Sequence, residues 1–585
     1  MEEEKGKWLD HLEEAVPTEG YGNRLSMYLI ALEAWRRGIT VNFFTVDNPE
    51  NKILIRYSLK LNNKEHKFVS SRGDKLTDEA FEVCDNKDLT KQYLKKAGIK
   101  VPEGKRFEDA TETYQDIIDY GVSLGFPIVL KPVNENAGKG VFSNVNTKEE
   151  LISTLDYVIE TLNYTDLIIE EFISGTEYRV LTVGEKIAAA VNRIPANIVG
   201  DGEKTIEELI KEKNKIKRVN PNLSKKTIQI DKEIMESIEK ADYTLDSIPE
   251  ENEQLFLRSK SNISTGGDPI DVTDQLTDEQ TNVVRKTIQA IPGLTSSGMD
   301  LMINPDDQSP TVIEVNTKPM LGLHTYPMEG QAYDVVKEIV DYYFPETIDQ
   351  KKSNLYFDFE KVLSPLDNLS TKKIELVPPK TLEKIYSKKI ILSGEGFNDG
   401  FRNQIRLEAM KLELHGHTRK LDDEHLEILV GSENTEAIDR FISECKELSD
   451  EVIINEVSEV FWNKPICIGF RKLQKTRREW KEITKKLNVD NQNLEKANKK
   501  IKRERKKVKQ ENKTLNKDMI EIKGKYKEIK SKYKKIKIKR KQLRYKYEEV
   551  INENQKLKQE IKDIKNSRSW QITKPLRKAT SLIKK

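Results

Sequence analysis

The sequence contains few of the residues that mark several common protein classes. Its 585 residues include only three cysteines and six histidines. The cysteines, Cys84, Cys445 and Cys467, are far apart and lack the spacings of metal or redox sites, so we interpret them as buried or incidental thiols. No Ser/His or Cys/His pair stands out as a nucleophile with its base.

Long apolar runs are also missing. No run reaches the length of about 18 residues that a membrane span requires, and the first residues, Met-Glu-Glu-Glu-Lys, lack the apolar region of a signal peptide. We therefore expect a cytoplasmic protein. The length allows three or four domains. With 34% charged and 36% hydrophobic residues, the chain is expected to be soluble and partly non-globular.

The net charge of +2 conceals a strong asymmetry along the chain. Residues 471–585 carry 42 Lys and Arg against 14 Asp and Glu, a net charge of +28. The remainder carries 58 against 84, a net charge of −26. An acidic body and a basic C-terminal region are expected to have different tasks.

The most informative segment lies between residues 298 and 319. The apolar runs 301–303 and 312–313 predict two short buried strands joined by a polar turn. Glu314 and Asn316 are two residues apart, so on a strand they share a face, and Asp300 precedes the first run. Mg²⁺ prefers such oxygen ligands and usually shares them with a nucleotide. These three residues are therefore the predicted metal ligands.

The patterning predicts a multidomain α/β (α+β) chain with six regions. Residues 1–85 form an N-terminal α/β unit, in which 25–35 have helical spacing and 40–44 indicate a strand. Alternating strand and helix patterns follow, with a Lys/Glu-rich stretch (203–245) expected to be helical and peripheral. The predicted regions after the first are an α/β domain (86–345), a linker (346–388), a second compact domain (389–470), a basic coiled coil (471–566) and a cationic tail (567–585).

Several motifs in the second region occur in an order typical of one family. They are Asn86-Lys-Asp-Leu-Thr-Lys91, Phe126-Pro-Ile-Val-Leu-Lys-Pro132, Ala137-Gly-Lys-Gly-Val141, Glu170-Glu-Phe-Ile-Ser-Gly-Thr-Glu-Tyr-Arg179, Arg193-Ile-Pro-Ala-Asn-Ile-Val-Gly-Asp-Gly202, Asn262-Ile-Ser-Thr-Gly-Gly-Asp-Pro-Ile-Asp271 and Val312-Ile-Glu-Val-Asn-Thr-Lys-Pro319. Over residues 85–345, the chain resembles the ATP-grasp ligases, most closely the ATP-grasp domain of cyanophycin synthetases. The resemblance implies an ATP-grasp fold that uses ATP with Mg²⁺ or Mn²⁺.

The resemblance also implies a role for each motif. Lys91 and Lys131 would place compact positive charges on the α- and β-phosphates. A glycine-rich turn would let backbone N–H groups approach phosphate oxygens, and the hinge backbone would contact adenine beside an apolar wall. Glu177 would accept hydrogen bonds from the ribose. The turn residues are Gly138, Lys139 and Gly140, and the hinge residues are Glu170, Glu171, Phe172 and Ile173.

Two arginines are candidates for catalysis beside Lys131. Arg179 and Arg258 would contact the γ-phosphate or the developing oxyanion, which suits a guanidinium group. A structural ion pair is the alternative for each of them. His324 follows the metal motif and is either a substrate contact or a structural histidine.

The implied reaction is the activation of a carboxylate as an acyl phosphate, followed by amide formation with an amine. Cyanophycin synthetases carry a further Mur-type ligase domain, whereas no Gly-Lys-Ser/Thr phosphate loop follows residue 345 here. A single amide-forming step is therefore expected rather than two-step elongation.

Residues 389–470 resemble acylphosphatase, through Gly394-Glu-Gly-Phe-Asn-Asp-Gly-Phe-Arg402 and Gly416-His-Thr-Arg-Lys420. This resemblance implies a βαββαβ ferredoxin-like fold, with Arg402 at the phosphate-binding position. Lys420 occupies the position of the asparagine that orients water, but an ammonium group cannot accept a hydrogen bond. Asp399 adds a negative charge beside the phosphate cradle. We therefore expect a spacer or docking domain rather than an active phosphatase.

From residue 487 onward, apolar residues recur every seven positions. The series is Leu487, Leu494, Ile501, Val508, Leu515, Ile522, Ile529, Ile536, Leu543, Val550, Leu557 and Ile564. It predicts a coiled coil, and four asparagines at the other core position (Asn491, Asn498, Asn512 and Asn554) favour a parallel homodimer. A single long helix is the alternative.

The chain ends in a short cationic segment with apolar residues. Asn566-Ser-Arg-Ser-Trp-Gln-Ile-Thr-Lys-Pro-Leu-Arg577 resembles tails that follow coiled coils in bacterial cell-surface polysaccharide glycosyltransferases, although Gln571 replaces the usual arginine. Such a segment suits an anionic membrane face or an acidic partner of the envelope machinery. No module that would read a nucleic-acid sequence is present.

Two interpretations of the whole chain remain open on these grounds. One is a carboxylate–amine ligase acting on small-molecule or peptide substrates, in the cytoplasm or at the inner membrane face. The other is a coiled-coil scaffold that retains a nucleotide-binding fold. For residues 389–470 alone, an active acylphosphatase is the less favoured alternative.

Overall fold

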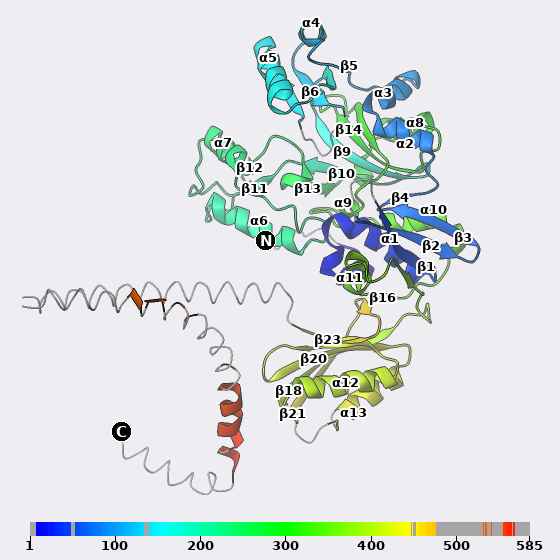
Figure 1. The fold of residues 1–585 in the computed structure, drawn as a ribbon, viewed down its shortest axis with the longest axis vertical. Coiled ribbons are helices and arrows are strands. Elements are labelled where there is room, and N and C mark those ends of the chain that lie inside the picture. Colours follow the sequence, from blue (N-terminus) through cyan, green and yellow to red (C-terminus); the bar gives the residue numbers. More distant parts are fainter. Residues whose placement is uncertain are drawn as a thin grey trace, which may run out of the picture. The chain divides into compact units, whose positions relative to one another are not determined.

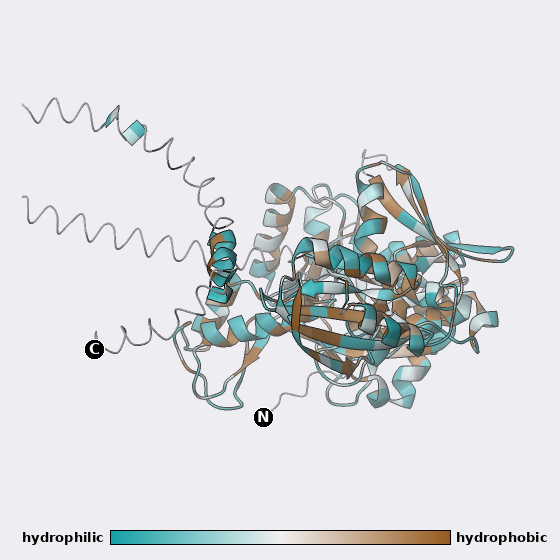
Figure 2. Cartoon of the chain, turned by 90° about the horizontal axis from the view of Figure 1, so that it is seen from below, coloured by the Kyte–Doolittle hydropathy of each residue, from teal (hydrophilic) through white to brown (hydrophobic). Residues whose placement is uncertain are grey.

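The computed structural model describes residues 8–47, 53–133, 140–445, 447–448 and 452–474, with scattered positions between 530 and 567. The chain divides into two units, Met1–Gln474 and Lys475–Lys585, and each is described by itself. In the first unit, sheets and helices alternate (Figure 1), and apolar strands lie between helices whose outer surfaces are mainly hydrophilic (Figure 2).

The N-terminal part is built around a fully buried helix, α1. All twelve of its residues are buried, including the polar residues Ser26, Glu33 and Arg36 among otherwise apolar or aromatic side chains. Beside it lies a sheet with the strand order β17-β1-β2-β3-β4. The elements are α1 (Leu25–Arg36), β1 (Thr40–Asp47), β2 (Ile53–Leu61), β3 (Lys64–Val69), β4 (Arg72–Gly73), α10 (Val335–Tyr343), β16 (Leu355–Tyr356), α11 (Phe359–Asp367) and β17 (Lys373–Leu376). The helix and strand predicted at 25–35 and 40–44 are confirmed.

Residues 346–388 are not the linker that their composition suggested. They contain β16, α11 and β17, and β17 pairs with β1 in antiparallel fashion, Phe43 opposite Ile374. Phe357 and Phe359 pack against Tyr28 of α1. The segment therefore completes the N-terminal core, because β1 would otherwise be left as an open edge.

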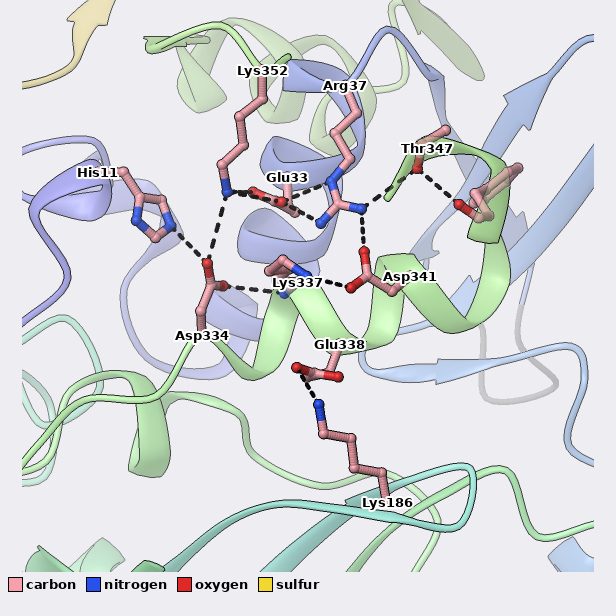
Figure 3. Close-up of polar contacts among 11 residues, drawn as sticks. His11, Glu33, Arg37, Lys186, Asp334, Lys337, Glu338, Asp341, Thr347 and Lys352 are labelled. Carbon is pink, nitrogen blue, oxygen red and sulfur yellow. Dashed lines mark hydrogen bonds and ion pairs between the residues drawn. The ribbon is translucent and has the colours of Figure 1, made fainter. Parts of the chain in front are cut away.

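Helices α1 and α10 are joined by an ion-pair network (Figure 3). The guanidinium group of Arg37 lies 2.6 Å from Glu33 and 2.5 Å from Asp341. Asp334 accepts the backbone N–H of Lys337 at 3.1 Å and lies 3.2 Å from the Nε2 atom of His11. Burial alone would raise the pKa of Asp334, but His11 and the positive charge of Lys352 outweigh it and lower this pKa to about 2.

The low pKa of Asp334 predicts acid sensitivity. A carboxyl group whose pKa is depressed on folding stabilises the protein above its unfolded pKa of about 4, and this contribution disappears as the pH falls toward 2. We expect Asp334→Asn to lower the free energy of unfolding by about 2 kcal/mol at pH 6, and the difference from wild type to vanish between pH 4 and pH 2. Urea unfolding at several pH values measures it, and a difference independent of pH would contradict the assignment.

The region after the N-terminal sheet contains two larger sheets. One has the order β5-β8-β6-β7 and the other β13-β10-β9-β14-β15. The elements are α2 (Asp78–Asp85), α3 (Lys87–Lys96), β5 (Gly104–Phe107), α4 (Tyr114–Leu124), β6 (Ile128–Pro132), β7 (Phe142–Val145), α5 (Lys148–Asp156), β8 (Leu167–Glu171), β9 (Thr176–Val183), β10 (Lys186–Ile194), β13 (Asp268–Asp271), α8 (Asp278–Ala290), β14 (Ser296–Ile303), β15 (Pro310–Asn316) and α9 (Gly322–Thr325). The two strands predicted around residues 301 and 312 are confirmed as β14 and β15.

The stretch 203–245 is helical in part, as expected, but it is not wholly peripheral. It forms α6 (Ile206–Val219) and α7 (Lys232–Lys240), beside a small sheet of β11 (Asn197–Val199) and β12 (Gln254–Phe256). The turn between the helices is buried at Asn220, Asn222, Leu223 and Lys226. Composition alone did not reveal this, because the burial depends on packing against the distant segment 320–326.

Residues 386–473 have the predicted ferredoxin-like order of elements. These are β18 (Tyr386–Glu395), α12 (Asp399–Lys411), β19 (His415–Lys420), β20 (His425–Ser432), α13 (Thr435–Cys445) and β21 (Ile453–Phe461), followed by β22 (Ile466–Cys467) and β23 (Phe470–Leu473). The sheet order is β21-β18-β20-β19-β23, and a separate apolar core fills it.

Most of the predicted coiled coil and nearly all of the cationic tail lie outside the described residues. Positions 554–563 are helical, and Leu557 and Ile561 are about half exposed. No helix found in the described part of the chain is long and apolar enough to cross a bilayer.

Candidate active site

A buried cluster of three charged residues joins helix α3 to the sheet of β6 and β8. The carboxylate of Glu170 on β8 pairs with Lys91 through one oxygen and with Lys131 through the other. All three residues are less than a tenth exposed. The sequence predicted both lysines as phosphate ligands, and the fold brings them to the same carboxylate.

Burial and charge act in opposite directions on this cluster. Burial alone would raise the pKa of Glu170, but the two ammonium groups outweigh it and hold the pKa below its ordinary value. The pKa of Lys91 is lowered, because burial and the repulsion from Lys131 exceed the attraction of Glu170. Two lysines that share one carboxylate leave one positive charge for an incoming anion such as a phosphate.

The predicted hinge follows directly after Glu170. The backbone N–H of Glu171 donates to Glu103 at 2.8 Å, and that of Phe172 donates to Pro127 at 3.2 Å. For Ile173, no backbone hydrogen bond occurs within the described part of the chain. Its backbone is therefore available to a ligand such as adenine.

The glycine-rich turn lies mainly outside the described residues, Gly138 and Lys139 included. Gly140 is described and has a φ of +69°, which a residue with a side chain rarely adopts. A Cβ atom there would approach Pro132 to 2.9 Å and Tyr164 to 3.2 Å. A glycine is therefore required at position 140, where the backbone packs closely against Pro132 at the end of β6.

A row of charged side chains crosses the sheet of β9, β14 and β15. Arg179 on β9 lies opposite Asp300 on β14, which lies opposite Glu314 on β15. Directly paired residues on neighbouring strands point to the same face. Asn316, two positions beyond Glu314, shares that face, as the sequence predicted.

Two arginines hold Asp300. The Arg179 guanidinium contacts it twice, with Nε–Oδ1 at 2.5 Å and Nη2–Oδ2 at 2.9 Å, and the Nη2 atom of Arg193 lies 3.0 Å from Oδ2. Arg193 also pairs with Glu177. Burial raises the pKa of Glu177 and the charge of Asp300 adds to this, although Arg193 opposes both. Glu177 was predicted to contact the ribose, and here its carboxylate belongs to the same charged face.

The three predicted metal ligands suit a hard cation in their donor chemistry. Within the described part of the chain, the side chains of Glu314 and Asn316 form no hydrogen bond or ion pair, so their oxygens are available. A bulge at Ile313 shifts the register between Glu314 and Val312, and such bulges often redirect side chains at sites. No cluster of three or more His, Cys, Asp or Glu residues suited to a metal was found among the described residues, and the predicted set contains an asparagine.

Arg258 is not brought to this face by any contact found between described residues. Its guanidinium pairs with Asp231 and Glu233, at the start of helix α7. The ion pair, which the sequence left open as an alternative, is therefore formed, and contact of Arg258 with the γ-phosphate stays a prediction.

Two polar residues near the site, Arg193 and Asp268, were not singled out as site residues, whereas the role of His324 was left open. Arg193 was visible only as the start of a motif. The carboxylate of Asp268 forms ion pairs with Lys213 and Lys217, each at 2.5 Å. His324 is 2% exposed, and burial together with the charge of Arg179 lowers its pKa to about 3, so its ring is neutral near pH 7. A buried histidine packed near Arg179 fits the structural alternative for this residue.

In the acylphosphatase-like domain, the side chain of Arg402 is occupied by the protein. Its guanidinium donates to the carbonyl oxygens of Leu473 at 2.5 Å and Thr418 at 3.3 Å, and it lies 3.3 Å from Asp399. Lys420 pairs with Asp423 at 2.9 Å. These contacts agree with an inert site.

We expect benzoyl phosphate to be hydrolysed no faster in the presence of the full-length protein than it is spontaneously. Lys420→Asn would restore the water-orienting amide while Asp399 still repels the phosphate, so Lys420→Asn combined with Asp399→Gly is expected to show more hydrolysis than either single variant. Phosphate release measures this. Rapid hydrolysis by the wild type would contradict the interpretation.

Comparison with known proteins matches two segments of the chain to family models. Residues 84–320 match the family model described as an ATP-grasp domain, and residues 388–470 match the model described as acylphosphatase. These segments therefore form an ATP-grasp domain and an acylphosphatase-like domain, as the two resemblances predicted.

The relatives share only part of their length with this chain. It is 31% identical over 331 residues to the glutathione biosynthesis bifunctional protein GshAB of Clostridium perfringens, covering 55% of this chain and 41% of that protein. It is 34% identical over 277 residues to cyanophycin synthetase of Synechocystis, covering 45% and 30%. A bifunctional glutathione synthetase structure from Pasteurella multocida is 27% identical, with a TM-score of 0.40, and covers 52% and 42%. The chain thus spans less than half of each of these proteins.

Proposed function

We propose that this protein is an ATP- and Mg²⁺-dependent ligase that joins a carboxylate to an amine through an acyl phosphate. The observation that carries the proposal is the row Arg179, Asp300 and Glu314 across three strands. Glu314 and its neighbour on the same face, Asn316, form no side-chain hydrogen bond or ion pair with another described residue. The match of residues 84–320 to the ATP-grasp family supports it, as do relatives named for glutathione and cyanophycin synthesis.

The reaction has two steps, which the chain assists mainly by positioning and charge. A carboxylate oxygen of the first substrate attacks the γ-phosphorus of ATP, and ADP leaves. The amine nitrogen of the second substrate then attacks the acyl carbon, inorganic phosphate leaves, and the nitrogen loses a proton. No covalent intermediate on the protein is needed.

Different side chains would serve the two ends of ATP. Lys91 and Lys131 bind the α- and β-phosphates, exchanging part of their pairing with Glu170 for phosphate oxygens. The hinge backbone at Ile173 contacts adenine. Asp300, Glu314 and Asn316 would hold Mg²⁺ or Mn²⁺, which neutralises charge on the transferred phosphoryl group when bound.

Arg179 would serve the transferred phosphoryl group. Its guanidinium fixes the carboxylate of Asp300 from one side, and Gly298 gives it room, since a Cβ atom there would lie 2.8 Å from its Nη1 atom. Arg179 thus remains beside the phosphoryl group, where a second positive charge stabilises the developing negative charge.

The proposal is tested by measuring ADP release from Mg·ATP with panels of carboxylates and amines, and by detecting the amide product with mass spectrometry. Release that requires both substrates is the expected result. A chain that fails to bind Mg·ATP would instead favour the scaffold interpretation.

We further propose that the heptad series makes the protein a parallel dimer. Leu557 and Ile561, on one face of the helical positions 554–563, are about half exposed in a single chain, and a second copy would cover them. Sedimentation equilibrium is expected to give twice the monomer mass, and a chain ending at residue 474 to give the monomer mass. A monomeric full-length protein would contradict it.

A further inference from the structure

Lys226 is a buried lysine that has no carboxylate partner within the described part of the chain. It is 9% exposed, its Nζ atom donates to Asn222 Oδ1 at 3.1 Å, and the sulfur of Met320 lies 3.6 Å away. Burial, reinforced by the charge of Lys217, lowers the pKa of Lys226 to about 8. By contrast, the ammonium group of Lys217 forms an ion pair with the carboxylate of Asp268 at 2.5 Å.

Two further donors on the same turn are unsatisfied. The Nδ2 atom of Asn222 and the Oγ atom of Ser224 are buried and have no hydrogen-bond partner among the residues that the structure describes. Buried polar groups are usually paired, and a buried charge without a counter-charge is costly. The turn therefore presents one positive charge, from Lys226, and two neutral donors, from Asn222 and Ser224. This combination is suited to binding an anion.

This turn adjoins the candidate active site. Met320 follows Asn316 by four residues, and Gly322 packs so closely on Asn222 that a Cβ atom would lie 2.9 Å from its Oδ1 atom. Pro319 lies against Gly298, beside the Arg179 guanidinium. The segment 317–322 therefore connects the predicted metal ligands to the turn of Lys226.

We propose that Lys226, Asn222 and Ser224 bind a carboxylate of one of the two substrates, other than the carboxylate that is activated. The proposal rests on the ligase function proposed above and narrows it to amino acids or peptides with a free carboxylate. A carboxylate fits because Lys226 has no carboxylate partner among the described residues, whereas Lys213 and Lys217 share the carboxylate of Asp268. The phosphates of ATP are assigned to Lys91 and Lys131 instead.

The test uses full-length protein and matched substrates. The twenty amino acids and N-acetyl-aspartate and N-acetyl-glutamate are supplied with Mg·ATP, each as the free acid and as the α-amide. The wild type is expected to show a KM at least tenfold lower for the free acid of one substrate than for its amide. Lys226→Met is expected to raise the free-acid KM more than tenfold and to leave the amide KM and the Kd of Mg·ATP within twofold.

Two variants separate binding from a structural role. Lys226→Arg keeps the charge and is expected to retain the preference for free acids. In the wild type that preference should decline above about pH 8, where Lys226 loses its proton, whereas in Lys226→Arg it should persist. Lys225→Met, at the adjacent exposed lysine, is expected to behave as the wild type.

The possible failures are distinguishable. If the wild type binds Mg·ATP and forms amides but uses free acids and amides equally, the carboxylate site is wrong and the ligase function stands. If Lys226→Met weakens Mg·ATP binding as much as substrate binding, or if Lys226→Arg loses the preference for free acids, the site is also refuted. If the wild type does not bind Mg·ATP, both proposals fail together.

Discussion

Replacing Glu314 with glutamine is expected to lower the kcat for amide formation by about 10³-fold, because a neutral amide holds Mg²⁺ poorly and leaves charge on the phosphoryl group uncompensated. The substitution should leave the fold intact, since the Glu314 side chain has no hydrogen bond or ion pair within the described part of the chain. Amine-dependent ADP release, titrated with Mg²⁺, measures the effect. Higher Mg²⁺ concentrations are expected to recover part of the lost rate.

A matched control lies in the turn between the same two strands. Asp306 is exposed, so Asp306→Asn removes one negative charge close in sequence without touching the predicted ligands. It should retain the rate and the Mg²⁺ dependence of the wild type. Equal losses in Glu314→Gln and Asp306→Asn would mean that general electrostatics, rather than metal binding, explains the result.

The second large effect is expected from Glu170→Gln. This change leaves the ammonium groups of Lys91 and Lys131 buried together without their shared carboxylate. Breaking a buried ion pair by removing one partner typically costs about 3–5 kcal/mol of stability. Mg·ATP should stabilise the variant more than the wild type, because phosphate oxygens take the place of the missing carboxylate.

Urea unfolding with and without Mg·ATP measures both parts of this prediction. Glu185→Gln, in the exposed turn between β9 and β10, serves as the control and is expected to change the unfolding free energy by less than about 0.5 kcal/mol. If Mg·ATP stabilised the wild type and Glu170→Gln equally, the two lysines would not be phosphate ligands.

Local pattern was enough to predict the elements that carry the site. The apolar runs 301–303, directly after Asp300, and 312–313 predicted β14 and β15, and the spacing of Glu314 and Asn316 predicted their shared face. These predictions succeed because alternation along a strand is a property of the strand itself. In the same way, the helical spacing of residues 25–35 was sufficient to locate α1.

Contacts between distant segments could not be predicted in this way. The composition of 346–388 suggested a linker, whereas β17 pairs with β1 across more than 300 residues. The stretch 203–245 looked peripheral, whereas its central turn is buried against the segment that follows the metal motif. Because polar, Lys-rich sequences are usually exposed, the burial of Lys226 could not be predicted from the composition of this stretch.

From the sequence alone it was possible to place the ATP-grasp and acylphosphatase-like segments and the strands that hold Asp300, Glu314 and Asn316, because these depend on short-range periodicity and on motifs. Only the tertiary structure decided which charges meet. It placed Glu170 between the two lysines, joined Arg179 and Arg193 to Asp300, and paired Arg258 with Asp231 and Glu233. It also left Lys226 without a counter-ion among the described residues. The reason is physical: a pairing between buried charges depends on their separation in space, which the spacing of residues along the chain does not specify.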